Sequence, residues 1–95
     1  MGSVLQVGPA QAGATNQRWA PIVDGRITVG GRIRQGRVSS GRLDWHVDPT
    51  SGAASVALNC RVHFADGSAI ELRNHAVVVH SADFEAGRVA ISSCA

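Results

Sequence analysis

The sequence predicts an all-β protein, a small antiparallel β-barrel of six or seven strands, and three observations carry this prediction. Apolar and polar residues alternate with a period of two in most segments, as they do in strands with one buried face. These segments are short and separated by glycine-rich turns, in a chain with 11 Gly and only 3 Pro. No segment shows the apolar period of a helix. Closing the sheet would bury the apolar faces and remove unpaired edges.

Length and composition indicate a single domain, residues 1–95. A hydrophobic fraction of 44% and a net charge of +2 are typical of a folded globule rather than of a disordered chain. A chain of this size buries only somewhat more than ~60% of the surface that it exposes when unfolded. We therefore expect either a barrel within one subunit or a core completed in a homo-oligomer.

The first half of the chain contains the signals of several short strands. The expected strands cover residues 3–7, 18–23, 26–29 and 32–38. The separating segments are Gly8-Pro9, the small-residue loop 10–16, a turn at Asp24-Gly25, a break at Gly30-Gly31 and a second break at residues 39–41. Within the last of these strands, Gly36 stands where a bulge or a barrel bend would fit.

The strand expected at residues 42–47 has two distinct faces. Leu43, Trp45 and Val47 lie on one side, and Asp44 and His46 lie on the other. A turn follows at residues 48–52. Near the end of the chain, residues 80–87 are expected to form a loop, and residues 88–91 a last strand with Val89 and Ile91 facing inward.

Residues 55–78 predict a β-hairpin, and its register can be derived from its apolar positions. The apolar face of the first strand consists of Val56, Leu58, Cys60, Val62 and Phe64. A three-residue loop, 65–67, with Gly67 in the left-handed conformation keeps this face apolar on both strands. The resulting pairs are Val62 with Ile70, Cys60 with Leu72 and Leu58 with Asn74. On the other face Arg61 then lies opposite Glu71, a favourable cross-strand ion pair.

Charge is unevenly distributed along the chain, and every basic residue other than histidine is an arginine. Through Leu43 there are six arginines against Asp24 alone, which gives +5; from Asp44 onward three arginines face six acids, which gives −3. This asymmetry is consistent with an anionic ligand, with head-to-tail association of subunits, or with chance. The arginines lack interleaved aromatic residues and a known nucleic-acid motif, so we expect no nucleic-acid partner.

The N-terminal residues and the cysteines exclude several other classes. Residues 1–6 lack the basic and apolar regions of a signal peptide, and no window approaches the ~20 apolar residues that cross a bilayer. We therefore expect a cytoplasmic protein without membrane association. Cys60 and Cys94 lack a metal-type spacing, and Cys60 falls on an apolar strand face, so we expect no disulfide.

Asn74 is the sharpest candidate for ligand binding, because the predicted register places its amide among apolar side chains. Burying that amide without a partner would cost roughly 1–3 kcal/mol. Such an amide could orient a ligand carbonyl or hydroxyl; alternatively it bonds to backbone at a bulge or to water. Trp45, on the same face, and Trp19 offer flat surfaces for a cyclic ligand, although tryptophan in a small domain also serves as core. Arg18, beside Trp19, completes the ligand-binding candidates.

Asp44 and His46 are the candidates for acid–base chemistry. They share a strand face two residues apart, so that the carboxylate could orient the imidazole or raise its pKa. The alternative is an ordinary polar face exposed to solvent. His63 and His75 fall on the polar face of the hairpin, and the four histidines lack metal-ligand spacing, so we expect no metal site.

Several short motifs follow one another in a distinctive order: Val7-Gly8-Pro9, Arg18-Trp19-Ala20-Pro21-Ile22, Gly31, Gly36, Gly41-Arg42-Leu43-Asp44-Trp45, Ala65-Asp66-Gly67-Ser68-Ala69-Ile70 and Arg73-Asn74. Over residues 7–79 this order resembles a bacterial and fungal family of unknown function, DUF3237. The resemblance implies an antiparallel barrel similar to the calycin and allene oxide cyclase barrels. Family members extend further at both ends. They also carry an Arg-Tyr pair where this chain has Asn59-Cys60, and an aromatic residue where it has Glu71.

Two functions follow as hypotheses. The first is a barrel that binds a cyclic or apolar metabolite, with Trp45 and Asn74 as contacts; the related barrels imply isomerase, cyclase or lyase chemistry without a cofactor, with Asp44 or His46 transferring the proton. The second is a structural or oligomeric interaction module that has lost a working pocket. Departures from the family pattern favour the second hypothesis, and an amide and a tryptophan on the apolar face favour the first.

Overall fold

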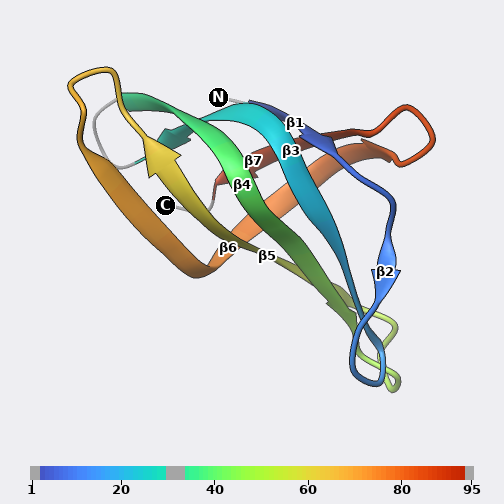
Figure 1. Cartoon of the computed structure of the whole chain (residues 1–95). Helices are drawn as coiled ribbons and strands as arrows, with labels where there is room; N and C mark the ends of the chain where they lie inside the picture. The colour runs from blue at the N-terminus through green and yellow to red at the C-terminus, as the bar shows by residue number, and fades with distance from the viewer. Residues whose placement is uncertain (1–2, 30–33, 94–95) are drawn as a thin grey trace.

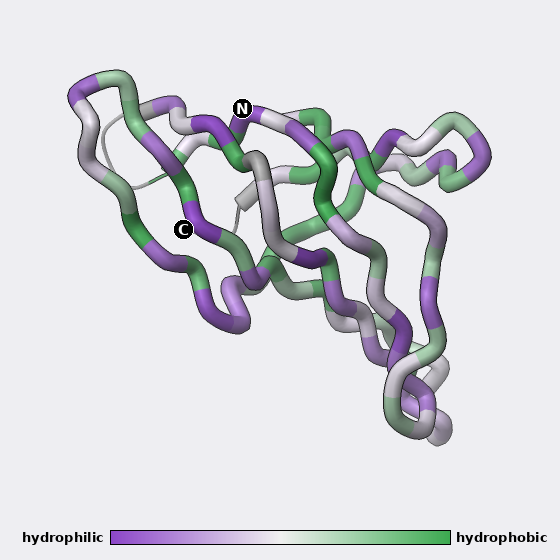
Figure 2. The backbone as a smooth tube through the Cα atoms, viewed as in Figure 1, coloured by the Kyte–Doolittle hydropathy of each residue, from purple (hydrophilic) through white to green (hydrophobic). Residues whose placement is uncertain are grey.

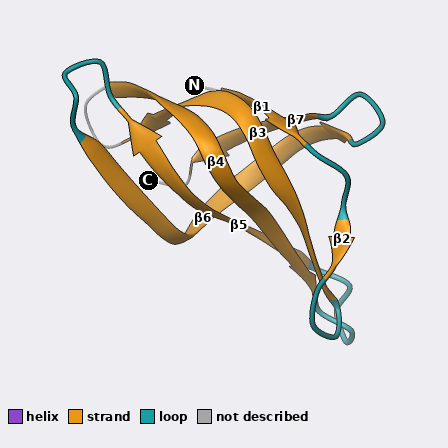
Figure 3. Cartoon of the chain, viewed as in Figure 1, coloured by secondary structure: helices purple, strands orange, loops and turns teal. Residues whose placement is uncertain are grey.

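The computed structural model describes residues 3–29 and 34–93, which form seven strands and no helix (Figures 1 and 3). The strands are β1 (Ser3–Val7), β2 (Gln11–Ala12), β3 (Gln17–Val29), β4 (Arg34–Val47), β5 (Ala54–His63), β6 (Ala69–Asp83) and β7 (Arg88–Ser93). Within these described ranges there is accordingly no helix able to cross a membrane.

The strands form one antiparallel sheet that closes on itself. Their order is β1-β7-β6-β5-β4-β3-β2, and β1 also pairs with β3. This last pairing joins six strands in a ring and leaves β2 outside it, attached to β3. The predicted small antiparallel barrel is confirmed. Because β1 supplies the closing strand, a second subunit is not needed to complete the sheet.

The barrel interior is packed with aliphatic side chains, and Figure 2 shows hydrophobic and hydrophilic residues alternating along the strands. The largest fully buried side chains are Leu5, Leu43, Leu58, Ile91, Val38, Val62 and Val89. The inward orientation predicted for Val89 and Ile91 is confirmed. A gap of about 10 Å³ lies inside, between side chains such as Leu58, Leu72 and Ile91. This gap between described residues holds at most about one water molecule, so it has no room for a metabolite.

The β5–β6 hairpin has the predicted three-residue loop. The Phe64 N–H donates to the Ser68 carbonyl at 2.9 Å, the Gly67 N–H donates to the Phe64 carbonyl at 3.1 Å, and Gly67 has a φ of 89°. The pairs Val62 with Ile70, Cys60 with Leu72 and Arg61 with Glu71 are all present. Near its loop, the hairpin register follows from the apolar pattern.

Beyond Cys60 the predicted register is wrong, because β6 contains a bulge. Leu58 pairs with His75, not with Asn74. Asn74 is exposed and has a φ of 49°, in the left-handed region that asparagine tolerates better than most residues. The extra residue exchanges the two faces of β6. His75, expected on the polar outer face, is therefore half-buried and lines the small interior gap with Leu58.

Two predicted interruptions lie within continuous strands. The turn expected at Asp24-Gly25 is part of β3, and the break expected at residues 39–41 is part of β4. A Cβ on Gly25 would lie 2.5 Å from Leu5 Cδ2, so this glycine allows β1 to pack against β3. At Gly41 the pairing of β4 with β5 shifts register. The glycines here mark bends of long barrel strands, not turns. The break expected at Gly30-Gly31 lies outside the described residues.

Smaller differences occur at the strand ends. β6 continues to Asp83, where it pairs with Arg88 of β7, so the loop predicted at residues 80–87 covers only 84–87. The loop at residues 10–16 contains β2. Val47, expected inward, is exposed because β4 extends beyond the packed core. Cys60 is buried, as its position on the apolar strand face predicts, and its thiol is free. Cys94 lies outside the described residues.

Candidate functional site

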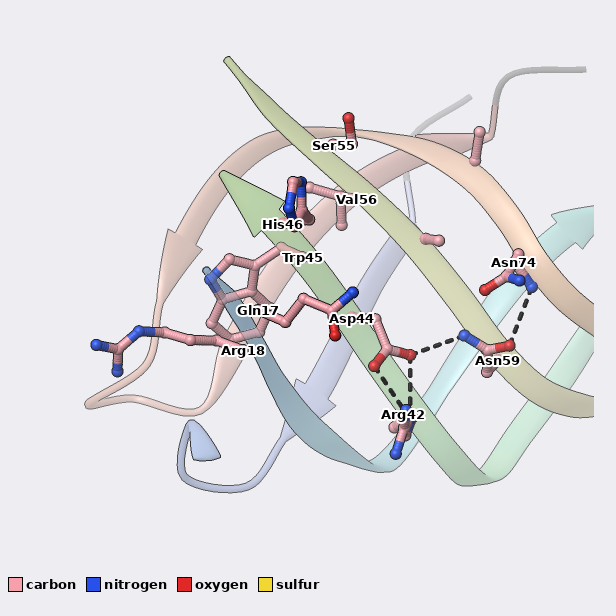
Figure 4. Close-up of a pocket in the computed structure, with 12 residues that line it drawn as sticks. Gln17, Arg18, Arg42, Asp44, Trp45, His46, Ser55, Val56, Asn59 and Asn74 are labelled. Carbon is pink, nitrogen blue, oxygen red and sulfur yellow. Dashed lines mark hydrogen bonds and ion pairs between the residues drawn. The ribbon is translucent and has the colours of Figure 1, made fainter. Parts of the chain in front are cut away.

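Five of the six predicted site residues line one hollow of about 450 Å³ (Figure 4). They are Arg18, Asp44, Trp45, His46 and Asn74. The other lining residues are Gln17, Arg42, Ser55, Val56, Ala57, Asn59 and Ala76. Strands β3, β4, β5 and β6 all contribute. Because Asp44 alternates with the buried Leu43 along β4, its side chain lies on the outside of the barrel, and the hollow is an open depression on that outer surface.

Asp44 is the centre of a hydrogen-bonded network that crosses three strands. Arg42 Nε lies 3.0 Å from Asp44 Oδ1 and 3.1 Å from Oδ2, and Asn59 Nδ2 donates to Oδ2 at 2.7 Å. Asn59 Oδ1 in turn accepts the backbone N–H of Asn74 at 3.0 Å. Figure 4 shows these contacts as one chain of dashed lines. The carboxylate is thus held in one position by a guanidinium and an amide.

Trp19 is the predicted residue that does not line the hollow. It lies opposite Asp44 in the β3–β4 register, and the guanidinium carbon of Arg42 is 5.5 Å from the centre of its ring. This is the geometry of a cation–π contact. Trp19 therefore contacts one residue of the hollow, Arg42, without lining the hollow itself.

Trp45 forms part of the apolar wall of the hollow. Its ring stacks on Phe84, with the centroids 5.2 Å apart and an interplanar angle of 29°. Trp45 is half-buried and packs against the edge of the core. Trp45 thus packs against the core and also lines the hollow. The sequence had suggested these as alternative roles.

Asn74 lines the hollow for a different reason from the one expected. The predicted buried amide is wrong, since the bulge places the side chain outside the barrel and exposed. The alternative expectation was an amide that bonds to backbone at a bulge or to water, and of this the bulge is present, with Asn74 in the left-handed conformation. Its amide is therefore accessible to a ligand without the desolvation cost that first singled it out.

Asn59 is a site residue that the sequence analysis did not select. It occurs on the polar face of β5, where a single asparagine is unremarkable. Its role depends on the bulge, which brings the Asn74 N–H within reach. Pairing β4 with β5 would have identified Asn59, because it then lies opposite Arg42 and close to Asp44.

Replacing Asn59 with aspartate should lower the free energy of unfolding by about 1–2 kcal/mol at pH 7. The new carboxylate still accepts the Asn74 N–H. Its other oxygen, however, replaces the Asn59 Nδ2 donor, which lies 2.7 Å from Asp44 Oδ2 in the parent, so two carboxylates face each other. Urea denaturation measures the loss. The double variant Asn59→Asp/Asp44→Asn restores one donor and one acceptor, so a non-zero coupling energy is expected. Simple additivity of the two losses would contradict the network.

The acid–base pair proposed from the sequence is only partly assembled. Asp44 and His46 share the outer face, as predicted, and both line the hollow. The hydrogen bonds of Asp44 nevertheless go to Arg42 and Asn59, and none within the described residues joins it to His46. The same described ranges contain no cluster of His, Cys, Asp or Glu suited to a metal ion.

The fold and the site together define a six-stranded antiparallel barrel with an open, mixed polar and apolar depression on its outer surface. Comparisons with family models, with curated protein sequences and with solved structures found no match to this chain. The resemblance to DUF3237 therefore stays a prediction.

Proposed function

We propose that this chain is a cytoplasmic small-molecule-binding protein whose ligand occupies the outer hollow between β3 and β6. The supporting observation is that five residues selected from the sequence, from three different strands, line the same hollow. The packed side chains of the described core also favour an outer site, because the gap of about 10 Å³ between them accommodates no metabolite.

The chemistry of the lining indicates the class of ligand. Trp45, Val56 and the alanines of β5 and β6 provide apolar surface. Around it, His46, Ser55 and Asn74 provide hydrogen-bond donors and acceptors. A cyclic metabolite with one apolar face and polar substituents satisfies both.

Binding is better supported than catalysis. Asp44 already accepts hydrogen bonds from a guanidinium and an amide, which favours a fixed carboxylate that accepts a ligand hydroxyl. A general base needs access to the proton that it removes, and His46, exposed on the same face, is the group with that access. A cofactor-free isomerase, cyclase or lyase activity remains a prediction from the resemblance.

Native mass spectrometry of the freshly purified protein tests the proposal. We expect a discrete small-molecule mass that is retained by Trp19→Ala and lost in Trp45→Ala. These two variants are matched, since each removes one of the 2 tryptophans and only Trp45 lines the hollow. Equal retention or equal loss in both would contradict the assignment of the site.

Asn74→Gly is the second variant, because it preserves the backbone. Glycine adopts the φ of 49° found at this position, and the backbone N–H that binds Asn59 remains. If the amide contacts the ligand, affinity should fall roughly fivefold while the midpoint of urea denaturation stays within error. The dissociation constant follows from titration of the ligand identified by its mass.

A second candidate function, an oligomeric interaction module, is supported by a different surface. Val4 and Val78 project from the outside of β1 and β6 on either side of β7, and they are 56% and 46% exposed. A homo-oligomer could cover them. The same spectrum decides: a ligand-free oligomer that dissociates in Val4→Asp/Val78→Asp favours this candidate.

A further inference from the structure

A second hollow, of about 590 Å³, lies over β1, β3 and β4 and shares no lining residue with the candidate site. It is lined by Ser3, Val4, Gln6, Asp24, Gly25, Arg26, Gln35 and Arg37. Along β3, Asp24 in the second hollow lies six positions beyond Arg18 in the first, which corresponds to about 20 Å of strand. The two hollows are therefore separate places on the barrel.

The second hollow contains two arginines that face each other. Arg26 of β3 and Arg37 of β4 are direct cross-strand partners, and both are exposed. Like charges in directly opposed positions destabilise a sheet. On its other side Arg37 pairs with His63 of β5, so three basic side chains form one row across three strands. Two of the six arginines of the first half of the chain therefore line this one hollow.

One carboxylate compensates this charge in part. Asp24 Oδ1 accepts the Nε–H of Arg37 at 3.2 Å and the N–H of Gly25 at 2.9 Å. These bonds, the one from Arg37 foremost, hold the pKa of Asp24 below its usual value. Within the described residues Arg26 makes no hydrogen bond or ion pair of its own. Its guanidinium is therefore available at the side of the hollow.

We infer that Arg26 and Arg37 bind the oxyanion group of a small ligand, a phosphate or a carboxylate, in this second hollow. Guanidinium groups match both anions with paired hydrogen bonds. The anion would lie between the two cations and relieve their repulsion, and the side-chain amides of Gln6 and Gln35 line the same space. This anion site is separate from the first hollow, between β3 and β6, and does not depend on the ligand proposed there.

Titration with inorganic phosphate and with succinate, each against sodium chloride at equal ionic strength, tests the inference. The chloride series removes the effect of general screening. Saturable changes at the Nε–Hε resonances of Arg26 and Arg37 are expected. A response to phosphate alone identifies a phosphate site, one to succinate alone a carboxylate site, and one to both a general oxyanion site. Changes no larger than those in chloride would overturn the inference.

Three variants give effects of different sign. Arg26→Gln should weaken binding of the responding anion roughly tenfold. Asp24→Asn should tighten it, because the competing carboxylate is removed. Arg73→Gln is the matched control: Arg73 is exposed and pairs with Glu71 at 2.9 Å on β6, away from the hollow, so affinity should not change. Equal affinity in Arg26→Gln and Arg73→Gln would exclude this site.

Arg26→Gln also separates binding from loss of the fold. Since it removes one member of a like-charge pair, the variant should be at least as stable as the parent in sodium chloride. Phosphate or succinate should then stabilise the parent more than the variant at equal ionic strength. Equal stabilisation of both proteins would also overturn the inference.

Discussion

Replacing Gly41 with alanine is expected to lower the free energy of unfolding by about 3 kcal/mol or more. Gly41 has a φ of 140°, a conformation that is essentially restricted to glycine. An added Cβ would lie 2.4 Å from Cys60 Cβ and 2.6 Å from the Asn59 carbonyl oxygen. Both obstacles are backbone or near-backbone atoms, which a rotamer change cannot move. Urea denaturation monitored by circular dichroism measures the loss.

Gly52→Ala is the matched control for this prediction. Gly52 also has a positive φ, 73°, in the turn between β4 and β5, but a Cβ there would meet nothing within 4 Å. Its loss should be only about 1 kcal/mol, the cost of the left-handed conformation alone. If the two variants lost equal stability, the close packing of β4 on β5 at Gly41 would not be what requires glycine.

The same substitution should also disturb the candidate site. Gly41 precedes Arg42, and the atoms that its Cβ would displace belong to Asn59 and Cys60. Arg42 and Asn59 are the two partners that hold the Asp44 carboxylate. A register shift in β4 thus sets the geometry of the network, and the bulge in β6 supplies its last member, the Asn74 N–H.

The sequence predicts the fold best where strands pair without a bulge, because one cross-strand residue pair then determines the next. Between Cys60 and Leu72 the apolar period and the Gly67 loop specify a register, and that register is present. From Asn74 onward the apolar pattern no longer specifies the register of β6. The run Val77-Val78-Val79 is apolar on both faces, so the sequence does not show that the inward positions have changed from even to odd numbers.

Glycines were the other source of error, for a physical reason. A glycine predicts a turn and a bend of a barrel strand equally well, because both need small size or unusual dihedral angles. Only tertiary neighbours distinguish them: Leu5 stands against Gly25, whereas Gly52 faces open space. The candidate site also depends on tertiary neighbours that the sequence does not reveal. Asp44 and His46 follow from alternation within one strand, but the contact of Asp44 with Asn59 follows from pairing that no local pattern encodes.

Alkaline pH should destabilise the protein through Cys60. Burial raises the pKa of its thiol to about 11, from an ordinary value of 9.0. Between these values the unfolded thiol loses its proton while the folded one keeps it, so the unfolded state binds fewer protons and stability falls as pH rises. The contribution is complete below pH 9 and is lost as the pH passes 11. Two pKa units correspond to about 3 kcal/mol.

This chain isolates the effect unusually well, because it contains no lysine and no tyrosine. Cys94 is the other side chain that titrates in the same range, so the measurement uses a Cys94→Ser background. Urea denaturation at about pH 8, 9, 10 and 11 should show the decline in the free energy of unfolding. Adding Cys60→Val, which fills the buried position without an ionisable group, should abolish it. A decline of equal size in the valine variant would show that another group causes it.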